Sequence, residues 1–252
     1  MKKHLYILTG ASRGMGLAMA QQLLDPMHHL VCISRQVADS LAQRAEERGA
    51  GLAQWQLDLS HPLEAAARLG QWLSQQGSDP WSGATLINNA GVVAQAQPLS
   101  ALDAANISQA LRVGLEAPLL LTGTFLQHTQ AWNMPRRVLN ISSGLGRRAM
   151  ASQSVYCTAK AGMDQFTRCL ALEEALHPRG AKVCSLAPGV IDTDMQVQLR
   201  SGDDAQFPDR QGFVALKENG MLTSPADAAA RVLAYLARPD FGSQAIADVR
   251  DV

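Results

Sequence analysis

The stretch HLYILTGASRGMGLAMAQQLL (residues 4–24) decides the fold. Residues 4–9 form a short apolar run that includes a Tyr and an Ile, which predicts a β-strand. Gly10, Gly14 and Gly16 follow in a GxxxGxG turn, and the residues after the turn have the apolar spacing of a helix. A strand, a glycine turn and a helix in this order bring backbone amides and a helix N-terminus to a place where a pyrophosphate can bind. A tight strand-to-helix connection without any ligand is the alternative interpretation.

The same alternation of strand and helix continues along the chain. Further strands are predicted at 30–34, 54–57, 84–87, 137–141, 182–186 and 244–247. Helices are predicted from Ser60 and Pro62 to 76, from 102 to 130, from about 156 until His177, Pro178 and Gly180 stop it, and from Ser224 and Pro225 onward. The sequence has no internal repeat or linker, so residues 1–252 are expected to form one α/β domain.

Composition and charge argue against several classes of partner. Lys plus Arg and Asp plus Glu both number 22, which favours neither nucleic acid nor an anionic membrane surface. No stretch approaches the roughly 20 apolar residues of a membrane span, and the N-terminal apolar run ends too early for a signal peptide. The four cysteines are scattered without a CxxC motif or a metal-ligand cluster, so no metal site is predicted. We therefore expect reduced thiols and a cytoplasmic protein.

The residue after the second strand bears on the choice of cofactor. Dinucleotide sites that prefer NAD usually hold an Asp or Glu at about this point, where it binds the ribose hydroxyls. This chain has Arg35 instead, and Arg13 lies within the glycine turn. Either guanidinium can pair with a 2′-phosphate, so the two arginines predict NADP. The alternative for Arg35 is an exposed loop cation without a ligand.

Later turns lie where a bound cofactor would pass. DL (58–59) ends the third strand, NNAG (88–91) ends the fourth, and the sixth runs into PGVIDT (188–193). The carboxyl ends of strands are the edge at which open α/β sheets bind ligands, although a purely structural turn is equally plausible for each asparagine. The stretch 196–222 is irregular and polar, and such a segment in a compact domain is more often functional than packing. We therefore expect a substrate lid at about 190–222.

Three side chains provide a candidate catalytic set. Ser143 follows the fifth strand, and Tyr156 and Lys160 lie one turn apart on one face of the helix that comes next. An ammonium within roughly 4 to 6 Å lowers the pKa of a phenol by about 1 to 3 units, which suits proton exchange with a carbonyl or alcohol oxygen. The Ser143 hydroxyl can hold the same oxygen by a hydrogen bond. A Lys four residues after a Tyr also arises by chance, so the pair alone is weak evidence.

Assembled in order, these motifs are similar to those of the short-chain dehydrogenase/reductase family over essentially the full length of the chain. The matching elements are TGxxxGxG with its glycines at 10 to 16, DL at 58, NNAG at 88, Ser143, Tyr156, Lys160 and PGxxxT at 188 to 193. The resemblance implies a Rossmann-type, doubly wound, seven-stranded parallel sheet with helices on both faces, in three αβα layers. It also implies a nicotinamide cofactor.

The resemblance assigns roles to particular residues. Tyr156 is expected to act as the acid/base, Lys160 to hold the ribose and lower the phenol pKa, and Ser143 to orient the substrate oxygen. Asp58 is expected beside the adenine and Thr193 beside the carboxamide. The residues expected to bind NADP are Gly10, Ser12, Arg13, Gly14, Met15, Gly16, Arg35, Asp58, Leu59, Asn89, Ala90, Gly91, Tyr156, Lys160, Pro188, Gly189 and Thr193. The residues expected to bind substrate are Ser143, Tyr156 and Asp248.

One position departs from the family pattern. The family commonly places an Asn in the long helix, within a motif like VNL, to hold a water of the proton relay from the Lys. The matching residues here are Val113, Gly114 and Leu115. Gly114 has no side chain for this role and costs about 1 kcal/mol relative to Ala in a helix interior. The departure puts the relay in doubt and leaves the cofactor site untouched. Water bound to a backbone carbonyl can substitute, or turnover is slow.

The C-terminal third resembles the branch of the family that holds sepiapterin reductases and benzil reductases. The similar features are PGVIDTDMQ (188–196), the lid from Phe207 to Lys217, TSPADAA (223–229) and the ending FGSQAIADVRDV (241–252). In sepiapterin reductases an Asp in this terminal stretch anchors the pterin amino group, and Asp248 matches it by spacing. A carboxylate can accept paired hydrogen bonds from a guanidine-like ring edge. An exposed acid near a chain end is the alternative.

The expected function is an NADPH-dependent carbonyl reductase that transfers a hydride to a ketone of a small dicarbonyl or pterin-type substrate. A general short-chain alcohol dehydrogenase or 3-oxoacyl reductase is a second enzyme interpretation. A protein that binds NADP, has lost or slow turnover and acts by association is the alternative from another class, prompted by Gly114. The expected partners are a small carbonyl compound and, as is usual in the family, further copies of the chain in a homodimer or homotetramer.

Overall fold

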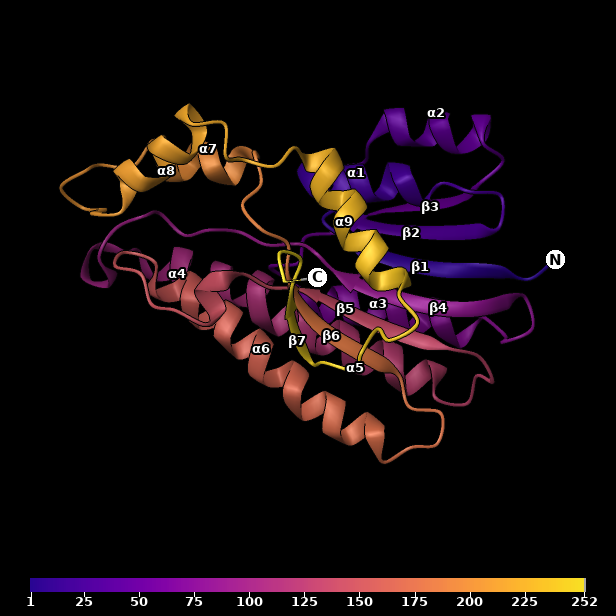
Figure 1. Ribbon diagram of the computed structural model, residues 1–252. Coiled ribbons are helices and arrows are strands. Elements are labelled where there is room, and N and C mark those ends of the chain that lie inside the picture. Colours follow the sequence, from indigo (N-terminus) through magenta and orange to yellow (C-terminus); the bar gives the residue numbers. More distant parts are fainter. Residues whose placement is uncertain (252) are drawn as a thin grey trace.

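The computed structural model describes residues 1–251 and places seven strands in one sheet (Figure 1). Every neighbouring pair of strands is parallel, in the order β3-β2-β1-β4-β5-β6-β7. The order reverses between β1 and β4, and the carboxyl ends of strands at such a switch point form a crevice for a ligand. The predicted seven-stranded, doubly wound parallel sheet is confirmed. The strands are β1 (Lys3–Thr9), β2 (His28–Ser34), β3 (Gly51–Gln56), β4 (Trp81–Asn88), β5 (Arg136–Ile141), β6 (Lys182–Ala187) and β7 (Ile246–Asp248).

The sheet extends beyond the apolar runs that predicted it. Strand β2 begins at His28 and β3 at Gly51, two and three residues earlier than the sequence pattern predicts. Ladder hydrogen bonds use backbone groups alone, so polar or small residues at a strand's beginning pair as well as apolar ones. The last strand is shifted toward the C-terminus and includes Asp248, which pairs with Ala187.

Alternate side chains of the central strands pack into two separate cores. In β1, Leu5 and Ile7 lie in one core and Leu8 in the other, because successive side chains of a strand point to opposite faces. Helices α1, α2 and α9 supply residues to the core of Leu8, and α3, α5 and α6 supply residues to the other (Figure 1). The helices are α1 (Gly14–Leu23), α2 (Asp39–Glu47), α3 (Pro62–Ser74), α4 (Ala104–Leu111), α5 (Ala117–Thr129), α6 (Ser154–Ala175), α7 (Asp194–Arg200), α8 (Arg210–Glu218) and α9 (Pro225–Ala237).

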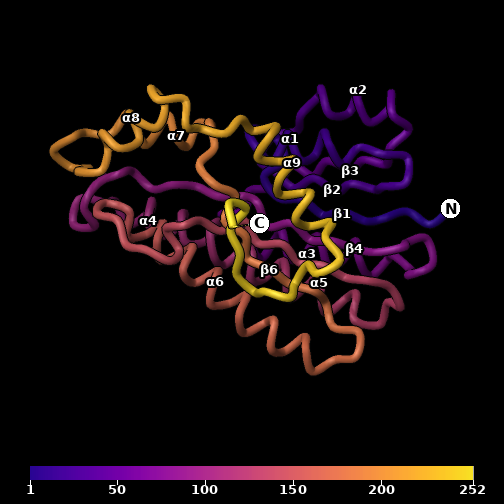
Figure 2. The backbone as a smooth tube through the Cα atoms, viewed as in Figure 1, coloured from indigo at the N-terminus to yellow at the C-terminus, as the bar shows by residue number. Residues whose placement is uncertain are grey.

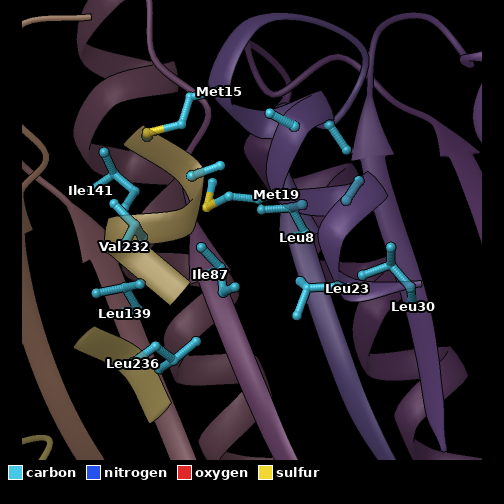
Figure 3. Packing of buried hydrophobic residues seen from close by; sticks show 14 of the residues in the cluster. Leu8, Met15, Met19, Leu23, Leu30, Ile87, Leu139, Ile141, Val232 and Leu236 are labelled. Carbon is cyan, nitrogen blue, oxygen red and sulfur yellow. The ribbon is translucent and has the colours of Figure 1, made fainter. Parts of the chain in front are cut away.

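The first core fixes the position of the glycine turn. Figure 3 shows Met19 and Leu23 of α1 in one cluster with Leu8 of β1 and with Val232 and Leu236 of α9. All five side chains are buried, and full burial of such a side chain stabilises the fold by roughly 1.5–3 kcal/mol. Helix α1 begins inside the turn, so this packing holds the turn at the carboxyl edge of the sheet.

The helix predicted at 102–130 is interrupted at its centre. Helix α4 passes through a π-helical segment, Arg112–Glu116, before α5 begins. Pro118 has no N–H, so the carbonyl of Gly114 cannot receive the usual hydrogen bond from four residues ahead, which favours a wider turn here. A β-carbon built on Gly114 would lie 3.2 Å from the Ala159 side chain of α6. The glycine therefore lets this segment approach the helix that carries Tyr156.

The segment predicted to be irregular contains two helices. Helices α7 and α8 occupy most of 194–218, and the irregular backbone that the polar composition predicted is found in the connection between them and in residues 219–222. Phe207 in this connection is fully buried and packs against Phe213, with ring centroids 5.5 Å apart. These helices have only seven and nine residues, which is too short for a helical apolar period to be recognised in the sequence. Figure 2 shows this segment beyond the carboxyl ends of the strands.

The cysteines do not form disulfides in residues 1–251, and the same part of the chain contains no cluster of His, Cys, Asp or Glu that could hold a metal. Burial raises the pKa of Cys32 to about 12, which keeps this thiol protonated. Within these residues, no helix combines the length and apolar character needed to cross a membrane.

Candidate active site

One cleft of about 610 Å³ gathers most of the predicted site residues. Every residue predicted to bind NADP lines it, and so does Ser143. Most of the lining comes from the carboxyl ends of β1 to β6, from the connections that follow these strands and from helix α6. Asp248 is the exception, because it does not line the cleft. The topology thus brings together motifs that lie up to 183 residues apart, from Gly10 to Thr193.

The geometry of the glycine turn requires its glycines. Gly10 and Gly14 have φ of +71° and +55°, in the left-handed region that side chains disfavour. A β-carbon on Gly16 would lie 1.9 Å from the Gly10 carbonyl oxygen, and one on Gly10 would lie 2.9 Å from Ala90. The N-cap residue Arg13 gives no side-chain hydrogen bond to the first turn of α1. Helix amides without a side-chain cap beside a cleft fit the phosphates of a dinucleotide.

The two asparagines of NNAG have different structural roles. Asn88 is buried, and its amide nitrogen donates to Thr122 Oγ1 at 3.0 Å and to Asn140 Oδ1 at 2.8 Å. It therefore has the structural role that the sequence left open. The amide of Asn89 donates to the carbonyl oxygens of Thr9 and Gly10 at 2.9 and 3.2 Å. Asn89 thus ties the fourth strand to the glycine turn while lining the cleft.

Strand β5 and helix α6 deliver the three candidate catalytic residues to the same cleft. Ser143 follows β5 by two residues, and Tyr156 and Lys160 lie in the first two turns of α6. The Ser143 hydroxyl lies near enough to Tyr156 to lower the pKa of its phenol. Lys160 Nζ lies 5.7 Å from the centre of the Tyr156 ring and donates to the Ile141 carbonyl at 2.7 Å. A carbonyl oxygen placed between the two hydroxyls could accept hydrogen bonds from both.

Burial dominates the electrostatics of this group. Burial raises the pKa of Tyr156, and the neighbouring Ser143 side chain offsets only part of that effect. Burial also lowers the pKa of Lys160 to about 8, although the carboxylate of Asp164 acts in the opposite direction. Burial therefore outweighs any lowering of the Tyr156 pKa by the ammonium, and that expected effect stays a prediction. The Lys160 charge is directed to a backbone carbonyl instead of the phenol.

A buried carboxylate behind the catalytic residues was missed by the sequence analysis. Asp164 lies one turn beyond Lys160 and is 1% exposed. Its Oδ1 accepts hydrogen bonds from Ser142 at 2.5 Å and Ser185 at 2.6 Å, and its Oδ2 lies 3.3 Å from Arg147 Nε. The carboxylate thus joins α6 to β6 and to the residue before Ser143. The four-residue spacing from Lys160 was the available signal.

The two arginines expected at the 2′-phosphate are placed differently. Arg13 Nη1 forms an ion pair with Asp194 of α7 at 2.8 Å, and both side chains are largely exposed. Arg35 is exposed at the end of β2 and lines the cleft. The pKa of Asp58 is lowered mainly by the Ser60 backbone amide and to a lesser degree by the Arg35 charge. Arg35 and Asp58 therefore lie close enough to share one end of the cleft.

The residues after the last strand place an arginine, and not the predicted acid, in the cleft. Asp248 is 4% exposed, and its carboxylate accepts from Arg250 Nε at 2.8 Å and Nη2 at 2.6 Å. These hydrogen bonds lower the Asp248 pKa. Arg250 itself lines the cleft, as does Arg148. The interpretation of Asp248 as an exposed acid does not fit this burial. No sequence signal distinguished these two arginines from other exposed cations.

Comparisons with known proteins agree with this geometry. Residues 4–204 match the family model of short chain dehydrogenases. The chain is 37% identical to a benzil reductase ((S)-benzoin forming) of Bacillus cereus over 93% of this chain and 94% of that protein. It is 33% identical to the sepiapterin reductase of Meriones unguiculatus over 97% and 95%. A metagenomic short-chain oxidoreductase solved in complex with NADP has a TM-score of 0.73 at 25% identity, covering 98% and 95%. Because the family model spans well over half of the sequence, the chain belongs to the short-chain dehydrogenase family.

Proposed function

We propose that this chain is an NADPH-dependent carbonyl reductase that reduces a ketone of a small dicarbonyl or pterin-type substrate. The family consists of oxidoreductases that act on CH–OH groups and use NAD or NADP. The observation that carries the proposal is one cleft lined both by the glycine turn and by Ser143, Tyr156 and Lys160. Relatives that include a benzil reductase and a sepiapterin reductase support the substrate class.

The side chains supply the acid and the positioning that ketone reduction needs. A bound NADPH would supply the hydride that reduces the carbonyl carbon. Tyr156 would donate its phenolic proton to the carbonyl oxygen, and its raised pKa keeps that proton in place at neutral pH. Ser143 would donate a second hydrogen bond to the same oxygen. Lys160, with a pKa of about 8, can hold a cofactor hydroxyl and return a proton toward Tyr156.

The connection after β6 is proposed to close over the bound molecules. Its helix α7 is joined to the glycine turn by the ion pair between Arg13 and Asp194. Gln198 of the same helix donates to the Val93 carbonyl at 3.2 Å. Both contacts are exposed and individually weak, which is the property that a segment needs if it is to open and close.

The proposed activity is tested by following NADPH oxidation at 340 nm with four carbonyl compounds. The panel contains benzil, 1-phenyl-1,2-propanedione, sepiapterin and a 3-oxoacyl thioester. We expect reduction of at least one of the first three at more than ten times the rate found with the thioester. Failure to reduce any of the four, by protein that binds NADPH, would overturn the proposal and favour a role in association.

The preference for NADP is proposed to depend on Arg35. Replacing Arg35 by Ser is expected to raise KM for NADPH about 10- to 100-fold, since a charge-assisted pair with the 2′-phosphate is lost. KM for NADH should change less than threefold, because NADH has no 2′-phosphate. Arg44→Ser, on α2 and outside the cleft, is the control. Equal changes in both KM values would contradict this role.

A further inference from the structure

We propose that Arg250 is a specificity-determining residue that binds the second, non-reacting carbonyl oxygen of a 1,2-diketone. This proposal rests on the proposed reductase function and narrows its substrate class. It assigns a ligand to a cationic group that the mechanism above does not use. It also assigns Asp248 the task of holding that group in place.

The guanidinium of Arg250 lies in the same cleft as the candidate catalytic residues. Arg250 lines the cleft that Ser143 and Tyr156 share. A β-carbon built on Gly144 would lie 4.0 Å from Arg250 Nη2, so the guanidinium lies beside the residue that follows Ser143. A molecule whose reacting oxygen is held by Ser143 therefore has Arg250 as a neighbour.

Arg250 has hydrogen-bond donors that Asp248 does not use. Asp248 accepts from Nε and from one hydrogen of Nη2, and it also accepts from the Arg250 backbone amide at 3.0 Å. A guanidinium has five N–H donors, so three remain on the side away from Asp248. The Arg250 side chain is 61% exposed, whereas that of Asp248 is 5% exposed. The buried acid thus orients a donor group that faces the cleft.

The charge of the pair selects the chemical class of ligand. The carboxylate of Asp248 offsets the charge of Arg250, so a free anion gains little there. A neutral carbonyl oxygen still receives a charge-assisted hydrogen bond from the guanidinium. A pterin ring would present N–H donors to this place and would meet the N–H donors of Arg250. The Asp248 carboxylate, which could accept from the ring, already accepts hydrogen bonds from Arg250. The pair therefore favours a diketone over a pterin.

The apolar part of the same cleft agrees with this choice. Leu145, Leu199 and Phe213 line it together with Val93 and Met195. Such side chains suit the aryl or alkyl groups of a diketone. The substrate inferred from this lining has two adjacent carbonyl oxygens and apolar substituents.

The test compares benzil with deoxybenzoin, which has the same skeleton but only one carbonyl group. For Arg250→Met we expect kcat/KM with benzil to fall roughly 10- to 100-fold and kcat/KM with deoxybenzoin to change less than threefold. Arg238→Met is the matched control, because Arg238 and Asp240 form the same two-bond pair outside the cleft. That control should leave both values unchanged.

Two further measurements keep the proposal separable from the reductase function. The double variant Asp248→Asn/Arg250→Met removes the buried charge that Arg250→Met would leave unpaired, and it should show the same selective loss. Calorimetric binding of benzil to the protein with NADP should also weaken at least tenfold in Arg250→Met, whether or not turnover occurs. Equal losses for benzil and deoxybenzoin, or unchanged benzil binding, would overturn the role of Arg250. Reduction of neither ketone by a wild-type protein that binds benzil through Arg250 would overturn the reductase function instead.

Discussion

Replacing Tyr156 by Phe is expected to lower kcat for ketone reduction about 1,000-fold. The phenol shares the cleft with Ser143, and its ring lies beside the Lys160 ammonium, at 5.7 Å from ring centre to Nζ. Phe keeps the ring and its packing but has no proton to donate. NADPH binding should therefore change less than threefold, measured by fluorescence titration alongside the rate at 340 nm.

Tyr235→Phe is the matched control for this experiment. Tyr235 lies on α9, packs against Phe241 and does not line the cleft, so its variant should keep the wild-type kcat. If Tyr156→Phe retains more than one tenth of the wild-type kcat, another group donates the proton. If it loses NADPH binding as well, the hydroxyl is needed for cofactor binding or for structure, and the assignment of the acid is not supported.

The sequence alone predicted the parts of the site whose function depends on backbone conformation. Gly10 and Gly14 have left-handed φ values, and a close contact leaves no room for a β-carbon on Gly16. Such positions favour glycine, so the turn can be recognised from a single sequence. Strands buried on both faces are equally legible, because nearly all their residues must be apolar. The resemblance supplied the order of the motifs, and the topology then brought them to one edge.

The sequence did not predict the contacts in which a polar side chain joins segments that are distant along the chain. Nothing local distinguishes Arg250, whose role depends on a cleft that residues up to 240 positions earlier help to line. The Asp248 side chain was expected to face substrate, but it forms an ion pair with Arg250, two residues later in the chain. Helices α7 and α8 were missed for another reason, since at seven and nine residues each is too short to show a clear apolar period.

The departure at Gly114 has a structural counterpart. The π-helical segment and Pro118 leave the Gly114 carbonyl without its usual helical donor. The same segment packs closely on α6, where a β-carbon on Gly114 would approach Ala159 to 3.2 Å. A side chain at this position would make a tight contact with Ala159, so one of the two segments would have to give by a few tenths of an ångström.

Asp164→Ala is expected to lower the free energy of unfolding by about 3 kcal/mol. The substitution leaves the buried hydroxyls of Ser142 and Ser185 without their acceptor and removes the partner of Arg147. Urea denaturation with an unchanged m-value measures this loss. Asp204→Ala should lose less than about 1 kcal/mol, because the Asp204 side chain that pairs with Arg210 is 58% exposed.

A positioning role for Asp164 predicts more than lost stability. Its negative charge raises the Lys160 pKa, so Asp164→Asn should move that pKa further below about 8. The ammonium would then lose its proton at lower pH, and the alkaline limb of the kcat/KM profile for NADPH should shift to lower pH. Asp204→Asn should leave the limb in place. If the folded Asp164→Asn protein shows no shift of the alkaline limb, Asp164 has only the structural role of joining β6 to the end of β5. A carboxylate with that role alone does not change the pKa of Lys160.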